Sequence, residues 1–297
     1  MSGLKAYAGV ARAPFLLLPV TLVAVGGGVA FLEGSFSWIR TTLALVGLVA
    51  LHMAVNIFNE WSDMRTGIDL ATERTPFSGG SGTLPQGQMS LGKALAFGIV
   101  CSAVGLAVGM YFLATIGLAM APLIVIGAVC VLVYTDFLAR IGVGEIAAGI
   151  GLGGGPVVGT ALVNTGAISA SALAAGIPAT LMTFNLLLLN EFPDQAADQA
   201  GGRRNLVLLL GRRRAALLYA LAALATPLSI LVSVVSGLLP VAGLVAMVPS
   251  LLLVKPLRWA FGDTDESVPI PALGANVIWN LATNTVLAIS LTVAGRL

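Results

Sequence analysis

Nine apolar segments separated by polar stretches run through the chain. They fall at about 14–32, 41–61, 93–115, 118–137, 145–163, 169–190, 214–236, 238–256 and 274–294. Several of them reach the roughly 20 residues that a helix needs to cross a bilayer. The breaks near 116 and 237 are short and predict tight helical hairpins. The pattern therefore predicts an all-α polytopic membrane protein with about nine transmembrane helices, forming one domain over residues 1–297.

The composition agrees with a membrane protein. The chain is 58% hydrophobic and 9% charged, whereas a soluble domain has about 25% charged residues. The small net charge of +2 gives no sign of a nucleic-acid partner, and we expect none. Cys101 and Cys130 lie inside apolar segments as small hydrophobic residues, so no disulfide is expected. The first apolar segment follows Lys5 and Arg12, as in a signal peptide. No small-x-small cleavage site precedes a soluble domain, so we interpret the segment as a retained helix.

The distribution of charge predicts the orientation. With a cytoplasmic N-terminus, helix alternation places every Lys and Arg except Arg40 and Arg296 on the cytoplasmic side. This asymmetry follows the positive-inside rule. The acidic residues lie on the same side, with Glu33 as the exception. We therefore expect a multi-pass protein of the cell membrane whose polar chemistry takes place at its cytoplasmic face.

A five-residue pattern, Asn-Glu-aromatic-x-Asp, occurs at 59–63 and again at 190–194. A further carboxylate follows each copy, Asp69 in the first and Asp198 in the second. The first and last residues of the pattern are four apart, so they project from one face of a helix. The second copy continues this spacing to Asp198 if the helix persists past Pro193, whose ring would bend it.

Two facing groups of carboxylates repel each other unless a cation lies between them. Asp and Asn oxygens are hard ligands that suit Mg²⁺, which commonly binds a few carboxylates together with substrate phosphates. No His or Cys cluster competes, so zinc is not expected. We predict that Mg²⁺ is held by Asp63, Asp69, Asp194 and Asp198. The alternative is a set of solvated loop acids or a purely structural repeat, which the duplication disfavours.

These two motifs resemble the aspartate-rich motifs of the UbiA-type polyprenyltransferase superfamily. The five residues between Asp63 and Asp69 are similar to the branch containing the 1,4-dihydroxy-2-naphthoate polyprenyltransferase of menaquinone synthesis. Further resemblance to that branch lies at 79–87, 134–135, 142–145, 155–160 and 202–211. The chain departs from the family pattern at Glu60 and Glu191, where Asp or Asn is frequent, and at Asn205, where Thr is common. These departures concern the acceptor and not the metal chemistry.

The resemblance implies nine helices around a central cavity with the aspartate motifs at its cytoplasmic mouth. It implies Mg²⁺-dependent transfer of a polyprenyl group from polyprenyl diphosphate to an aromatic acceptor, first of all 1,4-dihydroxy-2-naphthoate. Another acceptor of the superfamily (4-hydroxybenzoate, chlorophyllide, haem or glycerol phosphate) is the main alternative. A secondary transporter is a further one, because repeated motifs in two halves are typical of transporters.

The resemblance also distributes roles among the residues. Catalytic roles are expected for Asp63, Asp194 and Tyr134, although a belt tyrosine at the membrane interface is an equal alternative for Tyr134. Diphosphate binding is expected from Asn59, Arg65, Arg74, Arg140, Asn190 and Arg203, with forked hydrogen bonds from the arginines. The glycines at 149, 151 and 153–155 allow close helix packing or leave room for a prenyl tail.

Several other features have two interpretations. Residues 72–90, with glycines at 79, 80 and 82, form either a cap over the diphosphate or an unstructured loop, and we favour the cap. Arg12 binds an acidic acceptor or anchors the first helix. His52 is expected to pack between helices in preference to acting as a base. Glu145 suits the N-terminal dipole of its helix.

Two charged clusters are not expected to take part in the reaction. Arg212, Arg213 and Arg214 are expected to set topology and to contact anionic membrane lipid. Asp263, Asp265 and Glu266 are expected to form a solvated loop.

Overall fold

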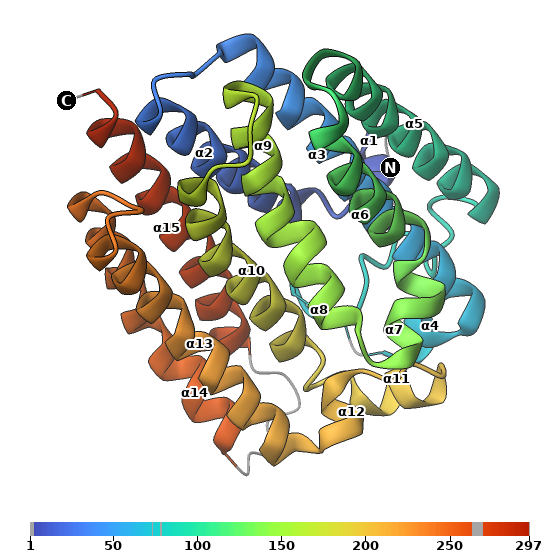
Figure 1. Cartoon of the computed structure of the whole chain (residues 1–297). Helices are drawn as coiled ribbons and strands as arrows, with labels where there is room; N and C mark the ends of the chain where they lie inside the picture. The colour runs from blue at the N-terminus through green and yellow to red at the C-terminus, as the bar shows by residue number, and fades with distance from the viewer. Residues whose placement is uncertain (1–2, 73, 78, 263–269, 297) are drawn as a thin grey trace.

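The regular elements of the protein are helices. The computed structural model describes residues 3–72, 74–77, 79–262 and 270–296, and no strand occurs among them (Figure 1). Eight segments are long and apolar enough to span a membrane: Ala13–Leu32 (η1, α2), Trp38–Thr66 (α3), Leu91–Ile116 (α5), Gly144–Thr165 (α8, η4, α9), Ala170–Asn190 (α10), Arg212–Val235 (α13), Val241–Phe261 (η5, α14) and Ile270–Ala294 (α15). A shorter apolar helix covers Leu118–Leu132 (η2, α6). The prediction of an all-α polytopic protein with about nine transmembrane helices is confirmed.

Short elements complete the chain. Inside the composite segments, α2 is Leu17–Leu32, α6 is Ala121–Leu132, α8 is Gly144–Gly149, η4 is a π-helix at Ile150–Gly154, α9 is Gly155–Thr165, η5 is a 3₁₀ helix at Val241–Leu253 and α14 is Val254–Phe261. The remaining elements are α1 (Gly3–Val10), α4 (Ile68–Ala71), the π-helix η3 (Tyr134–Leu138), α7 (Ala139–Ile141), α11 (Gln195–Ala200) and α12 (Leu206–Leu210). The predicted solvated loop with Asp263, Asp265 and Glu266 lies outside the described residues.

Serine caps and glycine turns mark several helix ends. Ser37, Ser90 and Ser169 cap the N-termini of α3, α5 and α10, each accepting a hydrogen bond from the third backbone N–H that follows it. The predicted tight turns contain Gly117 at φ 95° and Gly237 at φ 73°. Only glycine adopts such angles without steric cost, so α5 and α13 each reverse sharply into the next element.

Glycines also let the helices approach closely. A Cβ atom built on Gly153 would lie 2.6 Å from the carbonyl oxygen of Ala179, where η4 crosses α10. The same test on Gly26 places the atom 2.5 Å from the carbonyl oxygen of Val157, where α2 meets α9. In a membrane, where no hydrophobic driving force brings helices together, small residues at such crossings allow the close van der Waals packing that does.

The second copy of the repeated pattern does not continue along one helix. Helix α10 ends at Asn190, a turn follows, and α11 begins only at Gln195. Pro193 has no N–H to donate and disfavours helical angles in the residue before it. Asn190, Asp194 and Asp198 therefore do not share one helical face, which differs from the expected continuation past Pro193. Similarly, α6 ends at Leu132 and the π-helix η3 follows.

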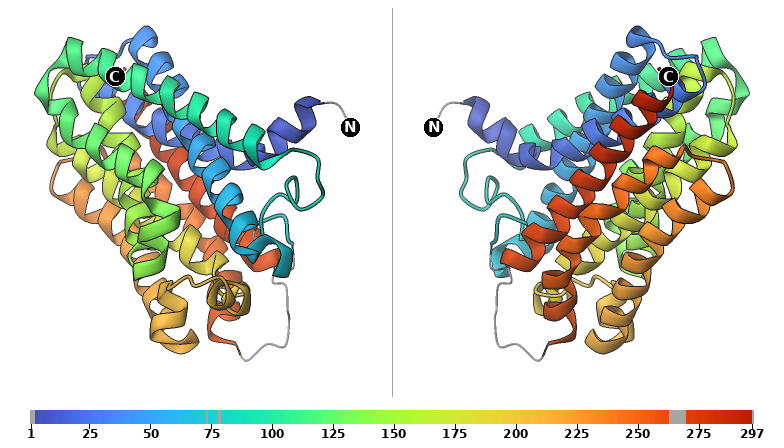
Figure 2. Two further views of the ribbon diagram at one scale, coloured as in Figure 1. Left: turned by 90° about the vertical axis from the view of Figure 1, so that its right-hand side faces the viewer. Right: turned by 90° about the vertical axis from the view of Figure 1, so that its left-hand side faces the viewer.

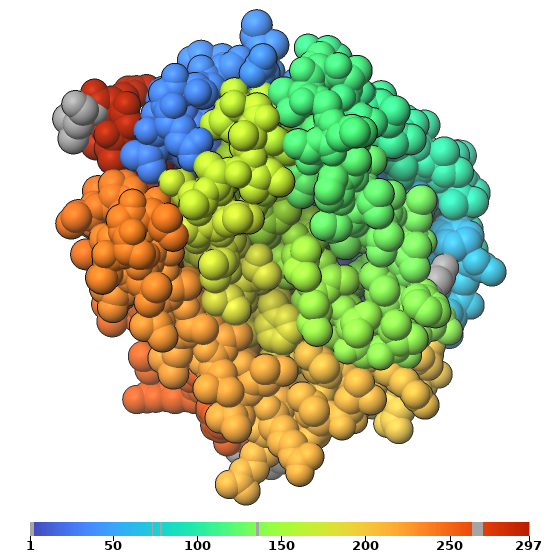
Figure 3. All heavy atoms as spheres, viewed as in Figure 1, coloured from blue at the N-terminus to red at the C-terminus, as the bar shows by residue number. Residues whose placement is uncertain are grey.

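The irregular segments gather at one end of the bundle. Figure 1 shows α4, α7, α11 and α12 together at its lower end, and Figure 3 shows the atoms of residues around 195–215 closing that end. The loop before α5 and the N-terminal helix α1 lie on the same side of the bundle (Figure 2). Both repeated motifs therefore reach the same end of the molecule.

We predict that Gly153→Ala destabilises the bundle, because its Cβ would overlap the backbone of α10. Overpacking of this kind costs about 1–3 kcal/mol. The measurement is the thermal unfolding midpoint in detergent. Gly127→Ala is the matched control, since a Cβ there meets no atom within 4 Å and alanine favours the helix. Equal midpoints for the two variants would contradict the close-packing role.

Candidate functional site

The two motifs line a single cavity of about 180 Å³. Its lining includes the predicted residues Asn59, Asp63, Asp69, Tyr134, Asn190, Asp194, Asp198 and Arg203. Helix α3 carries the first Asn–Asp pair near its end, α4 supplies Asp69, and the turn after α10 with α11 supplies the second set. The structure thus brings all four predicted metal-binding aspartates to one cavity.

Arg203 joins the two motifs directly. Its Nη2 atom donates to both carboxylate oxygens of Asp63 at 2.5 and 2.6 Å, and its Nη1 atom donates to Asp198 Oδ1 at 3.3 Å. With its amide oriented to satisfy both neighbours, Asn59 donates to Asp63 at 3.3 Å and accepts from Arg203 at 2.8 Å. The guanidinium therefore supplies positive charge between carboxylates that are far apart in the sequence.

Asn205 fixes the second motif from the other side. Its amide donates to Asp198 Oδ2 at 2.8 Å, while its side-chain oxygen accepts from the backbone N–H of Leu208 and caps α12. The sequence showed this residue only as a departure from the family pattern. An Asn directly before a short apolar helix is a capping signal, but its contact with Asp198 depends on the tertiary fold.

Glu60 ties the Gly-rich loop to α3. The N–H and hydroxyl of Ser81 donate to its two carboxylate oxygens at 2.5 and 2.6 Å, and Arg12 Nε lies 3.8 Å from Oε1. Gly80, at φ 72°, passes so close to Asp69 that a Cβ there would lie 2.5 Å from Oδ1. This loop also contributes Gly79 and Gly80 to the cavity wall. The arrangement supports a cap in preference to an unstructured loop.

The other predicted arginines do not line the cavity. Arg65 is exposed and stacks 4.4 Å from the ring centroid of Trp61. Arg74 is exposed and donates to the backbone oxygen of Asp69 at 3.1 Å. Arg140 is half-buried beside Gly202. Their diphosphate-binding roles would need a different side-chain arrangement from the one described.

Arg12 is a cavity residue instead. It lies in the cavity wall between α1 and α2, at φ 52° and ψ 53°, a conformation that is uncommon for residues other than glycine. Its guanidinium also lies 4.8 Å from the centroid of Phe15, a second lining residue. Of the two expected roles of Arg12, acceptor binding and anchoring of the first helix, its place in the cavity wall is compatible with acceptor binding.

Two glutamates, Glu145 and Glu191, lie close to each other at the second motif. Glu145 is fully buried and accepts a hydrogen bond from the N–H of Leu206, so its carboxylate caps α12 although the residue belongs to α8. Glu191 lines the cavity, and its pKa is raised well above the usual value by burial and then by the neighbouring Glu145. Glu191 is thus held more easily in its protonated form than an exposed carboxyl.

His52 and Arg212 lie in different surroundings. His52 is buried and lines the cavity. Arg212 lies over the rings of Phe192 and Trp259 and donates to the backbone oxygen of Trp259 at 3.1 Å. Arg212 therefore holds the turn after α10 against α14, a role beyond the expected contact with lipid.

The carboxylates have the chemistry of a magnesium site. Burial and then the charges of Asp63 and Glu60 raise the pKa of Asp69 to about 7, and burial and then Asp198 raise the pKa of Asp194 to about 7. Asp69 Oδ2 is buried without a hydrogen-bond partner. Among the described residues, no three Asp, Glu, His or Cys side chains are grouped as a preformed metal site. The free oxygen and the crowded negative charge nevertheless fit Mg²⁺, which accepts hard oxygen ligands.

The cavity combines an ionic wall with an apolar one. Positive charge beside the aspartates comes from Arg12 and Arg203. The apolar part of the wall is formed by Val55, Leu152 and Leu186. Such a site can bind a polyanion together with a divalent cation and keep water from the attached apolar group.

We predict that Glu60→Ala loosens the Gly-rich loop. It removes both acceptors of Ser81, and charged hydrogen bonds of this kind contribute about 1.5–3 kcal/mol. Hydrogen exchange at the amides of residues 79–84 should become at least about tenfold faster. Glu60→Gln, which keeps one acceptor oxygen in place, should show a smaller change. Unchanged exchange in Glu60→Ala would contradict the tethering role.

Comparison with known proteins bears out the resemblance drawn from the two motifs. A model of the UbiA prenyltransferase family matches residues 17–281. The 1,4-dihydroxy-2-naphthoate octaprenyltransferase of Mycobacterium leprae (strain TN) is 29% identical over 288 residues, which cover 93% of this chain and 92% of that protein. The enzyme of the same name from Escherichia coli (strain K12) is 24% identical over 278 residues, covering 92% and 90%. The Bacillus subtilis (strain 168) enzyme of that name is 25% identical over 173 residues, and the match spans about half of it (54%).

Solved structures share the fold. A UbiA homolog from Aeropyrum pernix K1, in its apo form, superposes with a TM-score of 0.71 at 19% identity, covering 94% of this chain and 98% of that one. A UbiA homolog from Archaeoglobus fulgidus bound to GPP and Mg²⁺ gives a TM-score of 0.67 at 16% identity, covering 97% and 99%. At these identities the likeness establishes the helical architecture.

Proposed function

The chain belongs to the UbiA prenyltransferase family, and we propose that it transfers a polyprenyl group from polyprenyl diphosphate to 1,4-dihydroxy-2-naphthoate. The observation that carries the proposal is the convergence of both Asn–x–x–x–Asp motifs on one cavity, joined through Arg203. The three curated relatives, each called 1,4-dihydroxy-2-naphthoate octaprenyltransferase, support this acceptor. A cavity at one end of the helices also favours an enzyme over a transporter, whose site usually lies near the membrane midplane.

We propose that the donor diphosphate binds between the two motifs. Asp63, Asp69, Asp194 and Asp198 would hold Mg²⁺. The binding of GPP and Mg²⁺ by the A. fulgidus homolog supports a metal-dependent reaction. The metal would neutralise the diphosphate and stabilise it as a leaving group. Arg203 can turn from the carboxylates to the phosphate oxygens through the same forked donors. Asn59 accepts a hydrogen bond from Arg203 and Asn190 lines the same cavity, so both can orient the diphosphate.

The prenyl transfer itself would take place in the part of the cavity from which apolar side chains exclude water. The allylic C–O bond breaks, and its electron pair leaves with the diphosphate. The resulting allylic carbocation is attacked by an electron-rich ring carbon, and loss of a proton restores the aromatic ring. The ring of Tyr134 lines the cavity and can stabilise the cation through its π face. Val55 and Leu152 exclude the water that would otherwise give a prenol.

The acceptor carboxylate needs a cation that the diphosphate does not use. Arg12 meets this need, because it lies in the cavity wall between α1 and α2, whereas Arg203 lies between the two motifs. An acidic aromatic acceptor therefore fits the charge of the site better than an uncharged one. The positive-inside rule and the position of the cavity support a site that opens to the cytoplasm at the cell membrane.

Removing a carboxylate from either motif should stop the reaction. We expect Asp63→Ala and Asp194→Ala to lower Mg²⁺-dependent release of diphosphate at least about 100-fold, because each loses charge that holds the metal. The measurement is diphosphate release by folded protein in detergent. Glu33→Ala, which removes an acid at the opposite end of α2, should leave the rate unchanged. Near-normal turnover in either aspartate variant would reject the metal-binding role.

A product assay tests the acceptor. Purified protein, Mg²⁺ and a polyprenyl diphosphate are incubated with 1,4-dihydroxy-2-naphthoate and, separately, with 4-hydroxybenzoate, and the products are identified by mass. We expect a prenylated product from the naphthoate alone. Prenylated benzoate without a naphthoate product would keep the chain in its family and overturn the acceptor assignment.

A further inference from the structure

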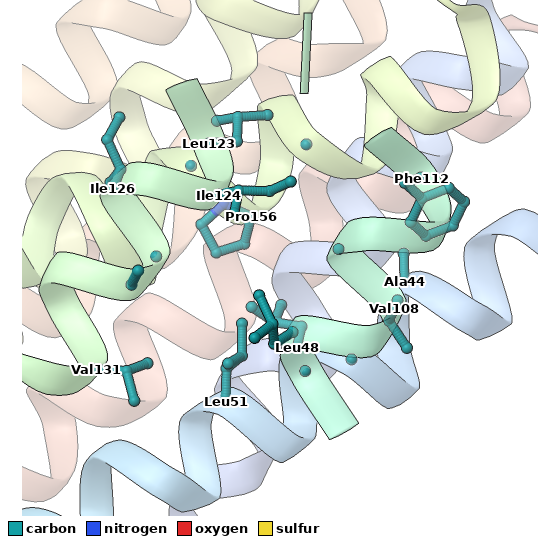
Figure 4. Close-up of a pocket in the computed structure, with 18 of the residues that line it drawn as sticks. Ala44, Leu48, Leu51, Val108, Phe112, Leu123, Ile124, Ile126, Val131 and Pro156 are labelled. Atoms are coloured by element: carbon teal, nitrogen blue, oxygen red, sulfur yellow. The ribbon is translucent and has the colours of Figure 1, made fainter. Parts of the chain in front are cut away.

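The cavities of the protein differ in the polar atoms that they present. One cavity, of about 230 Å³, lies between α3, α5, α6 and α9 and is walled by hydrocarbon side chains such as Leu48, Leu51 and Val108 (Figure 4). Ser102 and Thr160 also line it, and neither hydroxyl is a buried atom without a hydrogen-bond partner among the described residues. This cavity therefore offers a ligand no buried unpaired polar atom.

A smaller cavity of about 70 Å³, called the side pocket, lies between η1, α2, α10, α15 and the segment around Phe77. It shares the side chains of Phe15, Leu18, Phe77 and Leu186 with the cavity lined by both motifs, called the ionic cavity. The two spaces therefore adjoin. The walls of the side pocket are apolar, and among its described lining residues Asn280 of α15 has the only polar side chain.

The amide of Asn280 is held with its donor side unpaired. The residue is only 1% exposed, and its Oδ1 accepts a hydrogen bond from Nδ2 of Asn284 at 2.9 Å. Its own Nδ2 is buried and has no hydrogen-bond partner in the described part of the chain. Asn276, one turn earlier, differs because it donates to the carbonyl oxygen of Asn185 and accepts from the hydroxyl of Tyr219. A buried donor in apolar surroundings is unfavourable unless an acceptor pairs with it, so Asn280 points to a ligand.

Two aromatic rings connect this donor with the ionic cavity. The guanidinium of Arg12 lies 4.8 Å from the centroid of Phe15, and Phe15 lines both cavities. Phe77 also lines both, and a Cβ built on Gly274 of α15 would lie 3.3 Å from its ring, so this ring packs against α15. The junction of the two cavities thus has a guanidinium on the ionic side and the amide donor of Asn280 on the other.

From this arrangement we propose that the side pocket binds the hydroxyl-bearing edge of the aromatic acceptor, with Nδ2 of Asn280 donating to the hydroxyl oxygen. The proposal rests on the proposed function, which places the acceptor carboxylate at Arg12. In 1,4-dihydroxy-2-naphthoate the hydroxyl next to the carboxylate donates to it internally, so the remote hydroxyl is the one that Asn280 binds. The rings of Phe15 and Phe77 suit an aromatic ligand. Asn280 is therefore a specificity-determining residue for the acceptor.

Other ligands match the side pocket less well. A prenyl chain carries no acceptor atom beyond its diphosphate, so it would leave the amide of Asn280 unpaired in apolar surroundings. The ester carbonyl of a membrane lipid does carry an acceptor atom, but a lipid lacks the ring that Phe15 and Phe77 match. A hydroxylated aromatic compound uses both features of the pocket, which favours the acceptor of the reaction.

The test compares two acceptors in the wild type and in Asn280→Leu. Dissociation constants are measured on the full chain in detergent for 1,4-dihydroxy-2-naphthoate and for 1-hydroxy-2-naphthoate, which lacks the remote hydroxyl. The wild type should bind the dihydroxy compound at least about tenfold more tightly, because a site built to hydrogen-bond a hydroxyl rejects the analogue without it. Asn280→Leu should bind the two compounds within about twofold of each other, and its KM for octaprenyl diphosphate should equal that of the wild type. Asn280→Ala, which needs no additional space, should give the same result.

Asn284→Leu is the matched control. It removes a buried Asn from the same face of α15, outside the linings of both cavities, and leaves Nδ2 of Asn280 in place. It should retain most of the wild-type preference. Equal loss of the preference in the Asn280 and Asn284 variants, no preference in the wild type, or displacement of the naphthoate by added phospholipid would overturn the assignment. A wild type that shows the preference but forms no prenylated product would reject the proposed function and leave the side pocket as an aromatic binding site.

Discussion

The bridge from Arg203 to Asp63 and Asp198 is the interaction on which the site depends. Buried carboxylates repel each other strongly because the surrounding dielectric constant is low. The guanidinium, 19% exposed, offsets this repulsion with two short hydrogen bonds to Asp63 and a longer one, 3.3 Å, to Asp198. Removing one partner from a buried ion pair typically costs about 3–5 kcal/mol. The bridge therefore keeps the end of α3 against the segment that follows α10.

The membrane explains why this chemistry lies at one end. Within a bilayer every backbone polar group must be satisfied inside its own helix, so irregular backbone is tolerated only where protein or water can satisfy it. The turn after α10 and the Gly-rich loop meet this condition at the end of the bundle, where side chains complete their hydrogen bonding. Glu60 accepts from Ser81, Glu145 accepts from Leu206, and Asn205 caps α12.

The two halves of the repeat hold their carboxylates differently. After Asp63 the chain ends α3 at Gly67, in the left-handed region, and α4 presents Asp69 beneath Gly80. In the second copy, Pro193 ends α10 early and α11 presents Asp198. The two copies of the pattern, with spacings of six and four residues between their aspartates, therefore have different local structures.

The sequence by itself determined the membrane class, the approximate number of helices and the residues of both motifs, because hydrophobic length and spacing are local properties of the chain. The same is true of the hairpins at Gly117 and Gly237. Only the tertiary structure decided which arginine lies between the motifs, since Arg203, Arg140 and Arg74 are equivalent by residue type. It also revealed the contacts of Glu60 and Asn205, which join residues that no periodicity relates. Pro193 predicted only a bend of the helix, whereas in the structure α10 ends at Asn190, and the positions of Asp194 and Asp198 depend on packing after that break.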